Sequence, residues 1–278
     1  MNRDQKFETF RALHARPGAF VIPNPWNAGT ARILTALGFE ALATTSAGHA
    51  FAVGRRDSSA ALTRDEILDN AMSIVDATPL PVSADLEDGF GCTPELCAAT
   101  IRLAADVGLV GGSIEDATGD PQKPIYEFDL AVERIAAAAE TARHCRFLLT
   151  ARAENFLHGR PDLGDTIKRL QAFALAGADV LYAPGLPSLD AIREVCASVA
   201  KPVNVVMGLK GATYTVDELA AVGVKRISVG GSFARAALGA FVRAASEVKE
   251  RGTFTYAAVA LPHEEAHRYM AETERRST

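Results

Sequence analysis

Residues 80–116 read LPVSADLEDGFGCTPELCAATIRLAADVGLVGGSIED, which is two apolar runs separated by a longer amphipathic segment. Leu80–Asp85 and Val110–Ile114 have the length of strands and lack the strict alternation of a sheet that faces water. Pro94–Val107 has helical spacing and opens with Thr-Pro, which suits the cap and the first position of a helix. The stretch therefore predicts two buried parallel strands joined by a helix.

The same strand–helix pattern repeats along the whole chain. Strands are predicted at Ala19–Pro23, Ala41–Thr44, Leu80–Asp85, Val110–Ile114, Phe147–Ala151, Asp179–Tyr182, Pro202–Val206 and Arg226–Val229. Helices are predicted at Ala28–Leu37, Arg64–Ala77, Pro94–Val107, Phe128–Arg143, Leu163–Ala176, Leu189–Val199, Val216–Ala221 and Ser232–Glu250. Eight such units predict an α/β fold, a (β/α)8 TIM barrel that forms a single domain over residues 1–278.

Two features qualify this prediction. An open doubly wound sheet is the alternative, but no GxGxxG motif follows the first strand. Residues 251–278 have little barrel pattern, and we expect them to form a C-terminal helical tail. Its amphipathic stretch Glu264–Glu274 could dock on a neighbouring subunit.

Composition and charge narrow the class of protein. Of 278 residues, 48% are hydrophobic and 23% charged, and the net charge is −5, which argues against nucleic acid or an anionic membrane as the partner. No apolar run reaches the ~18 residues of a membrane span, and the N-terminus lacks an apolar signal core. Four cysteines do not make a disulfide framework. We therefore expect a cytoplasmic protein.

Acidic residues follow three neighbouring strands, at the barrel face where active sites lie. They are Asp57, Asp85, Glu87 and Glu115. Carboxylates that converge repel one another unless a cation lies among them, and ligands made only of oxygen favour Mg²⁺ or Mn²⁺ over zinc. Asp85 ends its strand directly and is the expected direct ligand, with the others acting mostly through water. The alternative is that these acids are helix caps or solvated loop charges.

Other polar residues at the same face suit an anionic substrate. Arg152 ends an apolar strand and can clamp a carboxylate through two parallel hydrogen bonds; the alternative is an ion pair with Glu154 or Asp116. A turn after the second strand offers hydroxyls and backbone N–H groups, and one amide side chain lies in the seventh strand. These substrate-binding candidates are Thr45, Ser46, Ala47, Gly48 and Asn204, together with Asp85. They predict a small dianionic α-keto acid or its enolate.

At these residues the sequence resembles the isocitrate lyase/phosphoenolpyruvate mutase superfamily. Asp85–Gly91 is similar to its D-x-D-x-G-F-G metal segment, Ser113–Asp116 to its I-E-D segment, and Thr150–Arg152 to its A-R segment. Ser46–Gly48 and Asp57 stand where the superfamily has a substrate loop and a metal-site Asp. The resemblance extends from Pro23 to the eighth strand.

The resemblance implies a barrel whose last helix is swapped between subunits of a homodimer or homotetramer. It implies Mg²⁺ held by Asp85, with Asp57, Glu87 and Glu115 acting mostly through water. It also implies an α-keto acid or enolate bound by the metal, Arg152 and the Ser46 loop. The chemistry makes or breaks a C–C or P–C bond beside that group, with Arg152 and Glu115 as catalytic residues.

The sequence departs from the superfamily in the loop after the I-E-D segment, after the sixth strand, where Ala183–Gly185 replaces the Pro-Glu pair of the lyases, and at Glu87. Lyases carry a K-[KR]-C-G-H loop after the I-E-D segment, and phosphonomutases carry a Lys-Asn-Ser-like loop there. Residues 117–126 read ATGDPQKPIY and match neither. Lys123 and Tyr126 are the remaining candidate proton donors of the expected lid, Gly119–Phe128, and the alternative is that both are ordinary exposed loop residues. The superfamily's second Asp is Glu87 here.

The favoured hypothesis is an Mg²⁺-dependent, methylisocitrate-lyase-like lyase or decarboxylase acting on a small α-keto or 2-hydroxy acid through a metal-stabilised enolate. Phosphonopyruvate-type P–C chemistry, a non-catalytic α-keto-acid-binding protein, and a barrel whose acids are structural are the alternatives. Among the histidines, His49 and His158 are expected on loops of the active face. The other four are expected at the surface: His14, His144, His263 and His267.

Overall fold

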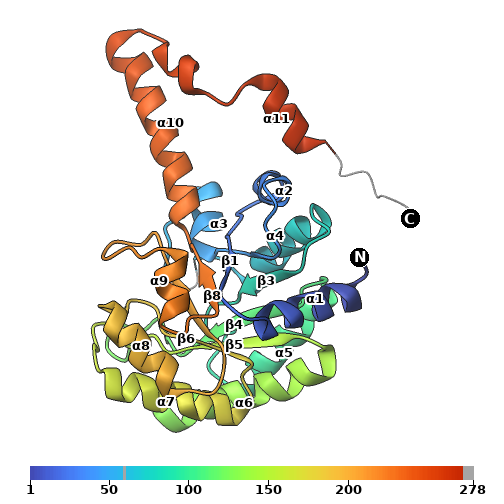
Figure 1. Cartoon of the computed structure of the whole chain (residues 1–278), viewed down its shortest axis with the longest axis vertical. Helices are drawn as coiled ribbons and strands as arrows, with labels where there is room; N and C mark the ends of the chain where they lie inside the picture. The colour runs from blue at the N-terminus through green and yellow to red at the C-terminus, as the bar shows by residue number, and fades with distance from the viewer. Residues whose placement is uncertain (59–60, 272–278) are drawn as a thin grey trace.

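Eight parallel strands form one sheet, ordered β1-β8-β7-β6-β5-β4-β3-β2, in the computed structural model, which describes residues 1–58 and 61–271 (Figure 1). The strands are β1 (Phe20–Ile22), β2 (Leu42–Ala43), β3 (Val82–Asp85), β4 (Gly111–Glu115), β5 (Leu148–Arg152), β6 (Val180–Tyr182), β7 (Val203–Val206) and β8 (Arg226–Ser228). At the seam, the Ala43 N–H donates to the Pro23 carbonyl over 3.0 Å and links β2 to the end of β1. The predicted (β/α)8 barrel is confirmed.

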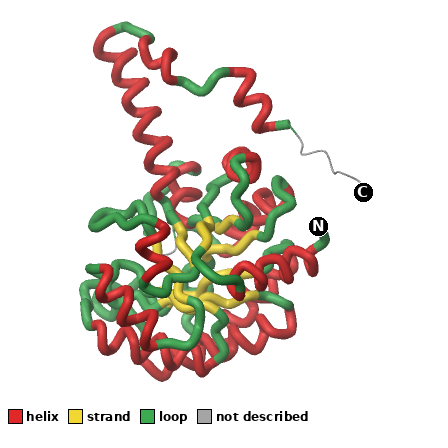
Figure 2. Tube along the Cα trace, viewed as in Figure 1, coloured by secondary structure: helices red, strands yellow, loops and turns green. Residues whose placement is uncertain are grey.

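Helices follow the strands and surround them (Figure 2). They are α2 (Ala28–Ala36), α4 (Arg64–Asp76), α5 (Pro94–Asp106), α6 (Phe128–Cys145), α7 (Leu163–Ala176), α8 (Leu189–Ser198), α9 (Val216–Ala221) and α10 (Ser232–Arg251). Each ends within two residues of its prediction because local signals fix the ends. Thr63 and Glu66 form a capping box at α4, and Gly177 ends α7 with φ +110°.

Two helices were not predicted. α1 (Arg3–Ala15) begins at a capping box between Asn2 and Gln5, and its Phe10 packs on Phe20 and Ile22 of β1. This packing also buries His14, so its expected surface position is wrong. α3 (Ser46–Ala52) replaces the turn expected after the second strand, with Thr45 as its N-cap.

The chain leaves the barrel along α10, which projects from it in Figure 1. A 3₁₀ helix, η1 (Thr255–Val259), and α11 (His263–Met270) follow. The chain then returns to the barrel, where Arg32 of α2 donates to the Met270 carbonyl over 2.9 Å. The end of the expected amphipathic stretch, residues 272–274, lies outside the described residues. Among the described helices, none combines the length and apolar character that a membrane crossing requires.

Candidate active site

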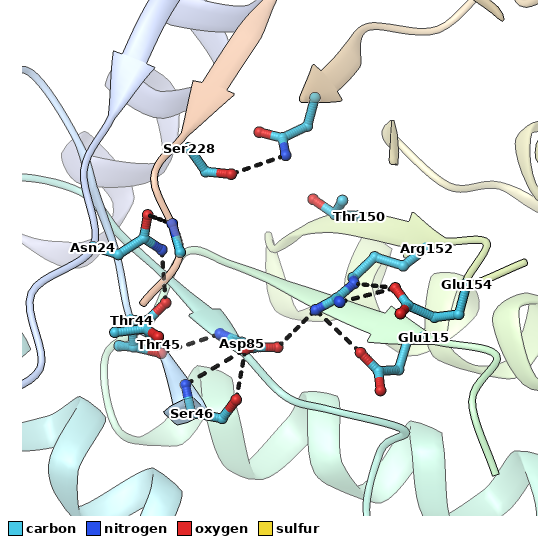
Figure 3. A network of polar contacts seen from close by, with 12 residues as sticks. Asn24, Thr44, Thr45, Ser46, Asp85, Glu115, Thr150, Arg152, Glu154 and Ser228 are labelled. Atoms are coloured by element: carbon cyan, nitrogen blue, oxygen red, sulfur yellow. Dashed lines mark hydrogen bonds and ion pairs between the residues drawn. The ribbon is translucent and has the colours of Figure 1, made fainter. Parts of the chain in front are cut away.

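Three neighbouring strands end at Asp85, Glu115 and Arg152, and the barrel brings these side chains together. The Arg152 Nη1 atom lies 3.1 Å from Asp85 Oδ1 and 3.1 Å from Glu115 Oε2 (Figure 3). All three line one cavity of about 880 Å³ at the carboxyl ends of the strands. The sequence-based grouping of these residues therefore matches the geometry.

A buried carboxylate fixes the orientation of Arg152. Its Nε and Nη2 atoms contact Glu154 Oε1 at 2.9 and 2.8 Å, and Glu154 is 2% exposed. The Glu154 N–H donates to Asp116 Oδ1 over 2.8 Å, while Arg169 Nη1 donates to Asp116 Oδ2 over 3.0 Å. The alternative expected for Arg152 was an ion pair with Glu154 or Asp116. Arg152 does pair with Glu154, in addition to Asp85, whereas Asp116 pairs with Arg169. The Tyr182 ring centre lies 5.0 Å from the Arg152 guanidinium.

The start of α3 faces the same carboxylate. The Ser46 hydroxyl donates to Asp85 Oδ2 over 2.9 Å, and its backbone N–H lies 3.4 Å from that oxygen. Thr45, Ser46 and Ala47 line the cavity, but Gly48 is not among its lining residues. The Gly48 N–H instead donates to Thr45 Oγ1, and a Cβ there would approach Thr45 Cγ2 to 2.7 Å. Gly48 therefore serves packing at the helix cap.

The remaining acidic side chains of the predicted metal site have raised pKa values. Burial, together with the charges of Asp85, Asp88 and Asp57, raises the pKa of Glu87 to about 8. Loss of solvent contact and the Asp85 charge raise the pKa of Asp57 at the cavity's rim. Burial raises the pKa of Glu115 well above its ordinary value, although Arg152 acts against the shift. Glu87 also holds φ +48°, a conformation that costs a non-glycine residue ~1–3 kcal/mol.

The chemistry of these side chains fits a hard divalent cation. The carboxyl groups of Asp57, Asp85, Glu87 and Glu115 line the cavity with the Arg152 guanidinium, and a bound cation would offset the mutual repulsion of their charged forms. Within residues 1–58 and 61–271, no three acidic, histidine or cysteine side chains are arranged to enclose an ion. In proteins Mg²⁺ usually takes one or two carboxylates as direct ligands and keeps several waters.

The expected proton donors lie away from the cavity. Lys123 is exposed, and neither Lys123 nor Tyr126 is among the lining residues. Tyr126 is buried: its hydroxyl donates to Asp88 Oδ2 over 3.2 Å, and the Arg134 guanidinium lies 3.8 Å from its ring centre. His158 does line the cavity, 3.8 Å from Glu154 Oε2.

Further polar residues of the cavity escaped the sequence analysis. Asn24 accepts the Val229 and Gly230 N–H groups, each over 2.9 Å, and donates to the Thr44 carbonyl. It lies two residues after the end of β1, so a search of the residues that follow each strand could have found it. Asn204, which was predicted, accepts from Arg226 Nε over 2.8 Å. Arg226 was missed because it stands at the beginning of its strand.

Comparison with known proteins agrees with this arrangement. Residues 10–249 match the phosphoenolpyruvate phosphomutase family. The chain belongs to this family. Its membership confirms the isocitrate lyase/phosphoenolpyruvate mutase superfamily that the motifs indicated.

Similar proteins include a Burkholderia cenocepacia protein assigned provisionally as a lyase or mutase. That protein is 59% identical to this chain in sequence, and its crystal structure superposes with a TM-score of 0.94 over 97% of this chain and 96% of the other. The 2-methylisocitrate lyase of Salmonella typhimurium is 29% identical over 76% of this chain and 74% of the relative. The structure of 2,3-dimethylmalate lyase is 26% identical, with a TM-score of 0.85 over 96% and 95% of the two chains.

Proposed function

We propose that this protein is an enzyme dependent on Mg²⁺ or Mn²⁺ that makes or breaks a C–C bond in a small α-keto or 2-hydroxy carboxylic acid. The observation that carries the proposal is the contact of Arg152 with Asp85 and Glu115 at the mouth of the barrel. Two of the relatives are lyases whose names give hydroxy acids as substrates. The family's mutase members make P–C chemistry the second candidate.

Asp85 is the proposed direct ligand of the cation, because it ends β3 among the other carboxylate side chains of the cavity. Asp57, Glu87 and Glu115 would act mostly through water. A bound divalent cation supplies positive charge that polarises a carbonyl oxygen and balances these carboxylates.

Arg152 supplies the protein's own positive charge to the substrate. Its guanidinium is held by Glu154, so it can present a fixed fork to a carboxylate or to an enolate oxygen as charge develops there. The Ser46 hydroxyl and the Ser46 and Ala47 N–H groups would hold the substrate carboxylate, with Thr45 beside them.

Proton transfer is proposed to involve Glu115, whose carboxyl lies 3.1 Å from Arg152 Nη1 and whose pKa is raised well above its ordinary value by burial. Lys123 and Tyr126 would reach the cavity only if segment 119–128 moved. An antiparallel β-bridge between Ala117 and Ile125 and a 2.7 Å hydrogen bond from the Tyr126 N–H to the Asp116 carbonyl hold the segment in its present position.

Calorimetric binding of oxalate, a stable enolate mimic, tests the proposed site. Wild-type protein should bind oxalate only when Mg²⁺ is present, and Asp85→Ala should abolish this binding. Asp69→Ala removes an exposed aspartate of α4 and is the matched control. Unchanged oxalate affinity in Asp85→Ala would remove Asp85 as the direct ligand, and binding that ignores Mg²⁺ would contradict the metal dependence.

We also propose a homodimer or homotetramer joined through α10. Of its 20 residues, only Ala234 and Glu247 are buried. Its apolar side chains Leu238, Phe241 and Val242 are 42%, 69% and 58% exposed and recur at helical spacing. A helix with such an outward apolar face projecting from the barrel suits packing against a second copy, as helix swapping would provide.

A further inference from the structure

The floor of the barrel holds a buried arginine that has no carboxylate partner among residues 1–58 and 61–271. Arg226, the first residue of β8, is 5% exposed. Its Nε donates to Asn204 Oδ1 over 2.8 Å, its Nη2 donates to Thr150 Oγ1 over 2.9 Å, and its Nη1 lies 3.4 Å from His14 Nε2. All three partners are uncharged when His14 is neutral, and none of the ion pairs found in the described part of the chain includes Arg226. A buried cation among neutral groups is unfavourable unless an anion joins it.

The active-site cavity extends down to this arginine. Its lining includes Ser83, Ser113, Asn204, Arg226 and Ser228 in addition to the residues at the strand ends. Barrels of this kind usually fill these inner positions with bulky branched side chains. Small hydroxyl residues two positions before Asp85 and Glu115 leave a polar space here instead.

We infer that this polar well, lined by Ser83, Ser113, Asn204, Arg226 and Ser228, binds the second carboxylate of a dicarboxylic substrate. The inference rests on the proposed function, which places the keto end of the substrate at Arg152. Thr150, which accepts from Arg226 Nη2, lies two residues before Arg152 on β5, which is roughly 6.6 Å along the strand at ~3.3 Å per residue. A short dicarboxylic acid such as oxaloacetate or 2-oxoglutarate suits this separation.

Asn204→Asp is the variant that isolates the well. Removing Arg226 would leave several buried acceptors without a donor and endanger folding. Aspartate at position 204 instead keeps the acceptor for Arg226 Nε, neutralises the guanidinium and repels an incoming carboxylate. Asn2→Asp makes the same chemical change at the exposed N-cap of α1, where aspartate also caps well, and serves as control.

Calorimetry in Mg²⁺ would compare 2-oxoglutarate with 2-oxopentanoate, which differ only in the distal carboxylate. Wild-type protein and Asn2→Asp should prefer the dicarboxylate by about tenfold or more, as expected for a hydrogen-bonded charge pair. Asn204→Asp should lose this preference and should unfold at an equal or higher temperature. Equal affinity of the wild type for both acids, or a preference that survives in Asn204→Asp, would overturn the inference.

Oxalate separates the two claims, because it is too short to reach Arg226 from Arg152. If wild-type protein fails to bind oxalate in Mg²⁺, the proposed function fails. If oxalate binds equally to wild type and Asn204→Asp while the dicarboxylate preference is absent, only the well is refuted.

Discussion

Acidification should destabilise this barrel through His14. The ring lies between Phe10 and Phe20, with centroid distances of 4.6 and 5.0 Å. Its Nδ1 contacts the Phe10 carbonyl at 2.8 Å, so Nδ1 carries the proton of the neutral ring and Nε2 faces Arg226. Burial, and then the Arg226 charge, lower the pKa of His14 from 6.5 to about 3.

The size of the effect follows from these pKa values. Between pH 6.5 and about 3, the unfolded chain binds a proton at His14 and the folded chain does not. Stability is therefore fully present above pH 6.5 and falls as the pH falls through this range. At about pH 5 the loss from this residue is about 2 kcal/mol relative to neutral pH.

Urea unfolding at about pH 7.5 and about pH 5 measures this loss. His14→Gln lowers stability at both pH values by removing ring contacts, but it should reduce the difference between them by about 2 kcal/mol. His144→Gln is the matched control, because His144 is exposed and its Nδ1 makes the same 2.8 Å contact with the carbonyl four residues earlier. A pH difference that is the same in wild type and His14→Gln would refute the reasoning.

Three further outcomes are expected. Arg152→Lys should weaken Mg²⁺-dependent oxalate binding by about tenfold or more, because an ammonium group cannot replace the guanidinium fork; wild-type affinity in calorimetry would contradict this. Mg²⁺ affinity should rise from about pH 6 to about pH 9, because Glu87, whose pKa is raised to about 8, must lose its proton before its carboxylate can help to hold a cation. An affinity that does not change with pH would count against the carboxylate site. Phe241→Asp should lower the oligomer mass seen in sedimentation, and an unchanged mass would exclude this face of α10 from the interface.

The barrel and the centre of the site could be predicted from local sequence. The strands are short apolar runs, and their helices carry caps and stop signals close to each end. Asp85, Glu115 and Arg152 end consecutive parallel strands; Glu115 pairs with Arg152, and Asp85 pairs with Ser113, two residues before Glu115, so all three lie at one rim. Nothing beyond the order of the elements is needed to bring these three together.

Features that depend on distant packing could not be predicted in this way. His14 reads as a surface residue of a polar N-terminal segment, and it becomes buried because α1 packs on β1 below the barrel. Arg226 follows Lys225 and resembles a solvated strand end, yet its side chain crosses the interior to Thr150. Tyr126 lies in a polar loop, and its burial follows from the position of Arg134 on α6.

The most direct test of the central claim is one ¹H and ³¹P NMR screen, run with Mg²⁺ and again with EDTA. The panel holds oxaloacetate, isocitrate, 2-methylisocitrate, phosphonopyruvate and phosphoenolpyruvate, with Asp85→Ala as the control for uncatalysed decay. We expect C–C cleavage of at least one carboxylic acid that EDTA and Asp85→Ala both abolish, with the phosphorus compounds unchanged. Turnover confined to the phosphorus compounds would assign P–C chemistry instead. No turnover of any compound by a protein that still binds oxalate with Mg²⁺ would favour a non-catalytic α-keto-acid-binding protein and contradict the account.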